Sequence, residues 1–347
     1  MSYAFFIRVL YSYNKRCLTM YQLLALLTGI LLSIMISING NLSDQYGAIL
    51  AAVIIHVVGS ISAFLLCVTQ KEKNPLHGHH PKWIYLGGAI GVCTTVFNNL
   101  AYGHISVTSI VALGLLGQTV TSLFIDTYGL FGMKKQSFNK NSILGFAVSF
   151  LGILLMLDQS VAGAIIAVFI SFCAGISVVL SRSVNARLAE KTGALRGSLI
   201  NHLVGLPITI IVALFAKQFS SIPSISAFHP WIYFGGIFGV AVIFLCNLTV
   251  PRISAFYLTL LTFVGQVFTG ILLDLIFGDH FSRASFVGGI IIIFGIAINF
   301  IIERIHTYKN EKERAYWSKI KRAEEEHRKV LLKIYEEQQT HDIIDKN

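Results

Sequence analysis

A glutamine and an aspartate recur at the same spacing in two apolar stretches, and these polar side chains are the first candidates for chemistry. Gln118 is followed eight positions later by Asp126, and Gln266 is followed eight positions later by Asp274. In a helix this spacing separates each pair by about 12 Å along the axis. Both stretches are long and apolar enough to cross a bilayer, where a polar side chain is costly and usually has a role.

Hydroxyl side chains extend each glutamine into a polar stripe. Ser122 lies four residues after Gln118, and Thr269 lies three residues after Gln266, so each shares a helix face with its glutamine. We expect Gln118, Ser122, Gln266 and Thr269 to line a cavity, although burial at a helix contact is an equal alternative for the glutamines.

Four ionisable side chains in the apolar stretches are candidates for ion coupling. Asp126 and Asp274 fall near the ends of their spans, so a structural bond to a neighbouring helix end is the simpler role for them. His56 and His202 occupy equivalent places in two other spans. A histidine titrates near neutral pH, but a lone membrane histidine is more often a packing residue.

The residues around these candidates repeat in the same order, which indicates a duplicated membrane unit. The matched residues are Trp83 with Trp231, Asn99 with Asn247, His56 with His202, and Asn39 with Asn185. Asn99 and Asn247 are candidate cavity residues, and hydrogen bonding between helices is their simplest role.

Composition excludes several classes of protein. Hydrophobic residues make up 54% of the 347 residues, charged residues only 13%, and the mean hydropathy is +0.69, which excludes a soluble two-domain protein. The net charge of +10 does not indicate nucleic-acid binding, because the basic residues lie in loops between apolar runs. The five cysteines show no CxxC spacing, and no nucleotide, hydrolase or metalloprotease motif is present. We expect no metal, no cofactor and no enzymatic activity.

The apolar runs predict an all-α membrane protein with ten transmembrane helices. The expected spans are 21–40, 47–68, 83–101, 105–127, 142–157, 161–181, 195–216, 231–250, 253–275 and 284–302. The expected units are an N-terminal extension (1–20), a first five-helix repeat (21–158), a second five-helix repeat (159–303) and a charged, mostly helical cytoplasmic tail (304–347). Residues 1–20 are either an interfacial helix or an extension upstream of a true start at Met20.

Loop charges predict the orientation. With the N-terminus inside, the cytoplasmic loops hold most of the basic residues, Arg182 among them, whereas the opposite loops offer only Lys217 and Arg283. Both termini are therefore expected in the cytoplasm. Because each repeat has five spans, the second repeat is expected to be inverted relative to the first.

The charged composition of the tail (304–347) predicts a solvated helix. The alternative is that this helix docks a partner or associates with a second copy. The tail contains no glycine or proline, and Glu324 with Arg328 forms one of its favourable pairs four residues apart. Its apolar stripe is too irregular for a regular coiled coil. The residues of this stripe are Trp317, Ile320, Ala323, Val330, Leu331 and Ile334.

The duplicated blocks resemble the YdcZ-like inner-membrane exporters of the drug/metabolite transporter superfamily, here as a fused pair of repeats. The residues that carry the resemblance are Asn185-Ala186-Arg187-Leu188, Gly193, Gly205, Gly87-Gly88, Gly91, Gly117-Gln118 and Asp126-Thr127-Tyr128-Gly129. Three features depart from it: Asn41 stands where the second repeat has Arg187, no glycine follows Asp274 as Gly129 follows Asp126, and His56 and His202 stand where aromatic residues are expected. The resemblance implies two inverted five-helix halves and a central cavity through which an ion or solute gradient drives small molecules.

The function expected from these features is a secondary transporter in the bacterial inner membrane. Its partners are a small-molecule substrate and membrane lipid, with no nucleic acid, and the tail offers a surface for a second copy or a cytoplasmic protein. There are two alternatives. One is a non-transporting membrane protein that docks a partner through its tail, and the other is an intramembrane enzyme.

Overall fold

The computed structural model describes the chain apart from its two ends and several loops. The described residues are 3–69, 80–102, 104–105, 107–133, 135, 143–157, 163–218, 229–277 and 283–344. Their regular structure is helical, with no strand among them, so the predicted all-helical class is confirmed.

The α-helices of the described residues follow one another in chain order. They are α1 (Tyr3–Tyr46), α2 (Ala48–Val68), α3 (Gly87–Ala101), α4 (Val107–Tyr128), α5 (Ile143–Met156), α6 (Ile165–Thr192), α7 (Ala194–Phe215), α8 (Gly235–Thr249), α9 (Ala255–Phe277) and α10 (Arg283–Ile344). Two 3₁₀ turns, η1 (Lys82–Tyr85) and η6 (Pro230–Phe234), lead into α3 and α8.

Helix length and composition show a multi-pass membrane protein. Seven helical segments of the described chain are long and apolar enough to span a bilayer, and Ile143–Met156, Ala255–Gly270 and Phe286–Asn299 are shorter apolar helices. Large apolar side chains on the outside of the bundle, such as Ile165 and Phe215, are exposed. Lipid suits this surface better than water does.

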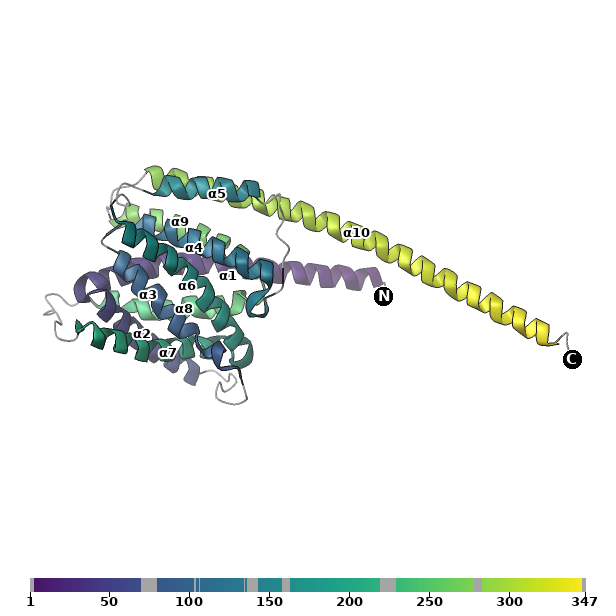
Figure 1. The fold of residues 1–347 in the computed structure, drawn as a ribbon, viewed down its shortest axis with the longest axis horizontal. Coiled ribbons are helices and arrows are strands. Elements are labelled where there is room, and N and C mark those ends of the chain that lie inside the picture. Colours follow the sequence, from purple (N-terminus) through teal and green to yellow (C-terminus); the bar gives the residue numbers. More distant parts are fainter. Residues whose placement is uncertain are drawn as a thin grey trace.

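The most extensive contacts join helices from opposite halves of the chain, and they occur in matched sets. The helix α4 packs on α6, and the equivalent α9 packs on α1; likewise α3 packs on α6, and α8 packs on α1. The helices α2 and α7 pack on each other, as do α5 and α10 (Figure 1). Each half therefore completes the packing of the other.

Glycines allow the closest of these approaches. A Cβ atom on Gly117 would collide with the carbonyl oxygen of Phe172 in α6, and one on Gly265 would collide with that of Leu26 in α1. Small residues at such crossings let the backbones meet, which is a common basis of helix association in lipid.

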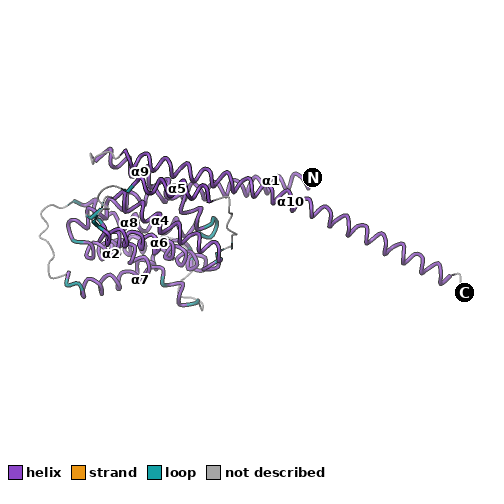
Figure 2. Tube along the Cα trace, turned by 45° about the horizontal axis from the view of Figure 1, so that its top comes forward, coloured by secondary structure: helices purple, strands orange, loops and turns teal. Residues whose placement is uncertain are grey.

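The helix α10 extends far beyond the bundle. It contains 62 residues, which corresponds to about 93 Å at 1.5 Å per residue. Its first part packs against α5, and its last part projects away from the other helices (Figure 1). The start of α1 projects from the same end of the bundle (Figures 1 and 2), and residues 3–20 form the first part of this helix.

Candidate functional site

A cavity of about 130 Å³ lies at the junction of the two halves. Helices α1, α2, α3, α6, α7, α8 and α9 contribute to its wall, which is mostly apolar with several amide and hydroxyl side chains. A concave site of this kind, with a few convergent polar groups, is the usual form of a small-molecule site.

Two histidines lie next to each other in the wall of this cavity. The ring centroids of His56 and His202 are 5.9 Å apart, and both side chains are buried. The Nδ1 atoms lie 2.8 Å from the Ala52 oxygen and 2.9 Å from the Ser198 oxygen, respectively. Because a carbonyl only accepts, each Nδ1 carries a hydrogen, and each neutral ring keeps Nε2 as an acceptor.

Each histidine ring lies against a glycine of the opposite half. A Cβ atom on Gly205 would collide with the ring of His56, and one on Gly59 would collide with the ring of His202. Both α2 and α7 carry a histidine followed three positions later by a glycine. Where the two helices cross, the histidine of each helix packs against the glycine of the other.

The two candidate asparagines hold neighbouring helices together. Asn99 donates to the carbonyl of Ala48 at 2.9 Å, and Asn247 donates to that of Ala194 at 2.9 Å. Asn247 also lines the central cavity, whereas Asn99 lines a smaller one of about 40 Å³.

The polar stripe of α4 and α9 lies mainly at helix contacts. Gln118, Ser122, Gln266 and Thr269 are all buried, but none of them is among the residues that line the central cavity. Ser122 lies 2.7 Å from the hydroxyl of Thr259 in α9. Their participation in a cavity stays a prediction.

Asp126 binds the beginning of α9. Its carboxylate oxygens accept hydrogen bonds from the backbone N–H groups of Ala255 at 3.1 Å and Phe256 at 2.9 Å. These N–H groups lack partners within the helix, and the helix dipole favours a negative charge there. Asp126 also lines a cavity of about 310 Å³ near the ends of α4 and α6. The side chain of Asp274 lies outside the part of the chain whose side chains are described.

Arg182 lines the central cavity, although the predicted span of 161–181 places it in the loop that follows. The helix α6 continues to Thr192, so the arginine is buried inside the bundle. Its Nη2 donates to Ser122 at 3.1 Å and to the Ala255 carbonyl at 3.0 Å, and it also binds Thr259. The match of Asn39 with Asn185 was a usable signal, since it places Arg182 inside a repeated helix.

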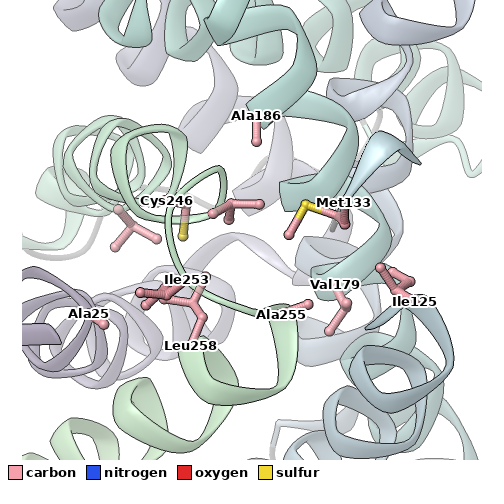
Figure 3. Close-up of a cluster of buried hydrophobic side chains, with 11 residues drawn as sticks. Ala25, Ile125, Met133, Val179, Ala186, Cys246, Ile253, Ala255 and Leu258 are labelled. Atoms are coloured by element: carbon pink, nitrogen blue, oxygen red, sulfur yellow. The ribbon is translucent and has the colours of Figure 1, made fainter. Parts of the chain in front are cut away.

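An apolar cluster contributes to the walls of both the central cavity and the one at Asp126. Figure 3 shows side chains from α1, α4, α6, α8 and α9 meeting there. Cys246 of this cluster lines the central cavity, whereas Met133 and Ile253 line the other.

Comparisons with known proteins support the same architecture. A solved structure entitled "Crystal structure of protein" is 13% identical, with a TM-score of 0.61 over 83% of this chain and 98% of that one. This likeness concerns the fold alone. No curated protein matches the chain. The family described as "Putative inner membrane exporter, YdcZ" matches residues 20–155 and again residues 166–298. Because these two matches cover most of the chain as consecutive repeats, the protein belongs to the YdcZ inner-membrane exporter family as a fused pair.

Proposed function

We propose that this protein is a secondary transporter that exports a small molecule across the bacterial inner membrane through the central cavity. The observation that carries the proposal is the position of the cavity, which lies where helices of the two repeats meet. In two-repeat transporters the substrate site lies at this junction, and access alternates as one half moves against the other.

In this proposal all ten helices cross the membrane, and the two repeats are inverted. The matched contacts of α4 with α6 and of α9 with α1 support a pseudo-two-fold relation. Both chain ends project from one end of the bundle (Figure 2), and the loop charges favour the cytoplasm for that end.

The arrangement of cavities supports a path through the protein. The smaller cavity at Asn99 shares Met35, Asn39, Thr94 and Thr95 with the central one, so the two cavities are neighbours. In the proposed orientation the smaller cavity faces outward, and the cavity at Asp126 faces the cytoplasm. The apolar cluster of Figure 3 is then the inner barrier, which must open for alternating access.

An ion or solute gradient drives export in this proposal. Among the candidate coupling residues with described side chains, His56 and His202 line the central cavity, and Asp126 does not. The two histidines are therefore the better candidates for linking proton binding to substrate movement.

Flux measurements test this function directly. Protein in sealed liposomes is loaded with radiolabelled metabolite pools, and release is followed with and without a pH gradient. We expect saturable flux of at least one pool in protein-containing vesicles and none in protein-free vesicles. Absence of flux for every pool, from protein that is folded and correctly inserted, would contradict transport.

A further inference from the structure

We propose that the central cavity binds the anionic group of its substrate, a carboxylate or a phosphate, and that Arg182 is the binding cation. This inference rests on the proposed function and names its substrate class. Of the described residues that line the cavity, Arg182 is the one with a permanent charge, and the lining contains no aspartate or glutamate.

The guanidinium of Arg182 is held in place but is not saturated. Its side chain is only 6% exposed, and Nη2 is anchored by Ser122, Thr259 and the Ala255 carbonyl. Its Nε–H is buried and has no hydrogen-bond partner among the described residues. A guanidinium presents five N–H donors in a rigid fork that fits carboxylate and phosphate oxygens. The anchored arginine therefore lines the cavity with one N–H group that has no partner among the described residues.

The charge of Arg182 is not neutralised by direct contact. The structure places no carboxylate within ion-pair distance of it among the described residues. Asp126 is near enough to attract the charge of Arg182 without contacting it, and both of its oxygens already accept backbone N–H groups of α9. A buried cation without a contacting anion is costly, so an anionic ligand in the cavity would relieve part of this cost.

The charge also breaks the symmetry of the repeats. Asn39 of α1 matches Asn185 of α6, and the residue three positions earlier is Ile36 in α1 but Arg182 in α6. Helix packing in the first repeat thus needs no charge at this position. The arginine is therefore a charge on one side of the cavity, as expected for a residue that orients a polar cargo.

Ligand-induced stabilisation tests the proposal on the wild-type protein. Purified full-length protein in detergent is titrated with small carboxylates, each paired with its own primary amide, and separately with inorganic phosphate and phosphate monoesters. The thermal midpoint should rise with one anionic series and remain unchanged with the amides and with small amines. Equal shifts with an acid and its amide, or shifts with amines alone, would overturn the proposal without any variant being made.

Variants then locate the site. Arg182→Gln should weaken the binding of the stabilising anion by about tenfold or more, because a charge-assisted hydrogen bond is lost. Arg182→Lys keeps the positive charge but lacks the planar guanidinium, so its affinity for the anion should lie between those of the wild type and Arg182→Gln. The matched control is Arg187→Gln on the same helix, since Arg187 pairs with Glu190 outside the central cavity and should bind the anion as the wild type does. Unchanged anion affinity in folded Arg182→Gln would contradict the assignment.

Liposome flux separates this inference from the proposed function. Export of a cation or a neutral molecule that is equally fast in Arg182→Gln would support transport and refute the anion site. Arginine-dependent anion binding without flux of the same anion would support the site and count against transport.

Discussion

Among single residues, Gly59 and Gly205 leave the space that the two histidine rings occupy. Gly205→Ala would place a methyl group against the ring of His56. We expect this overpacking to cost about 1–3 kcal/mol of stability. Thermal unfolding in detergent measures the loss.

A control and a rescue make this prediction specific. Gly114→Ala in α4 meets only ordinary contacts and should leave the thermal midpoint near that of the wild type. The double variant His56→Ala with Gly205→Ala removes the ring that collides, so part of the lost stability should return. Failure of this rescue would mean that the glycine is needed for another reason.

Asp126 is expected to act as a helix cap and not as the coupling site. Replacing it by alanine removes both acceptors of the α9 N–H groups and should cost about 0.5–2 kcal/mol, the usual loss on removing a cap. Asp126→Asn keeps one acceptor, so its flux and the pH dependence of that flux should be retained. Measuring flux at several pH values distinguishes the two roles. If Asp126 were the coupling carboxylate, flux through the Asp126→Asn variant would no longer depend on pH.

The sequence was informative about some of these residues and misleading about one. His56 and His202 could be selected because each is polar within an apolar run and matches the other across the repeat. Their meeting in one cavity could not be predicted, since it depends on the crossing of α2 with α7. Arg182 was assigned to a loop because a charge after an apolar run resembles the end of a span, and only the packing of its surroundings shows that α6 continues.

At the scale of helices, the burial of polar residues depends on which partner each helix meets. The second half of α6 is polar in sequence, yet Arg182, Ser183 and Asn185 are buried, because several other helices surround it. Hydropathy predicted the existence of the helices well, and the matched glycines indicated close packing. The helices α1 and α6 extend beyond the predicted spans, and α10 continues from the last span into the tail that was expected to be helical, because no proline interrupts any of them.

The crossings of α4 with α6 and of α9 with α1 should contribute equally to transport if the two repeats work as equivalent halves. Gln118 follows Gly117 at one crossing, and Gln266 follows Gly265 at the other. Replacing either glutamine by leucine removes a polar group that is buried between helices inside the membrane. The thermal midpoint should therefore not fall, while flux should decrease by a similar factor in both variants.

Comparing the two variants in the same liposome assay is the measurement. If Gln118→Leu abolished flux and Gln266→Leu preserved it, the equivalence of the halves would be refuted, and one crossing would be scaffold. Thr121→Val in α4 is a suitable control, because its hydroxyl is bonded to the carbonyl of Gly117 in its own helix.

At the scale of the whole molecule, both chain ends project from one end of the bundle (Figure 1), which we assign to the cytoplasm. Single cysteines placed at Lys82 and Lys135, in a background without other cysteines, should be protected from an impermeant thiol reagent in intact cells. A cysteine placed at Lys217 should react. Permeabilised cells give the control, since all three sites should then be labelled. The opposite pattern would reverse the orientation.

The end of α10 is expected to be dispensable for transport, because it leaves the bundle that contains the cavity. Its aromatic side chains Tyr308, Tyr316 and Trp317 are exposed, and the helix projects beyond the other elements (Figure 1). A chain truncated after Glu303 should therefore keep its thermal midpoint and its flux per molecule. Light scattering on the purified protein, compared with a chain lacking only residues 345–347, then reports on association. A halved particle mass would show that this helix joins two copies, whereas loss of flux from a folded, truncated protein would show that the tail is part of the transport machinery or the docking arm of a partner.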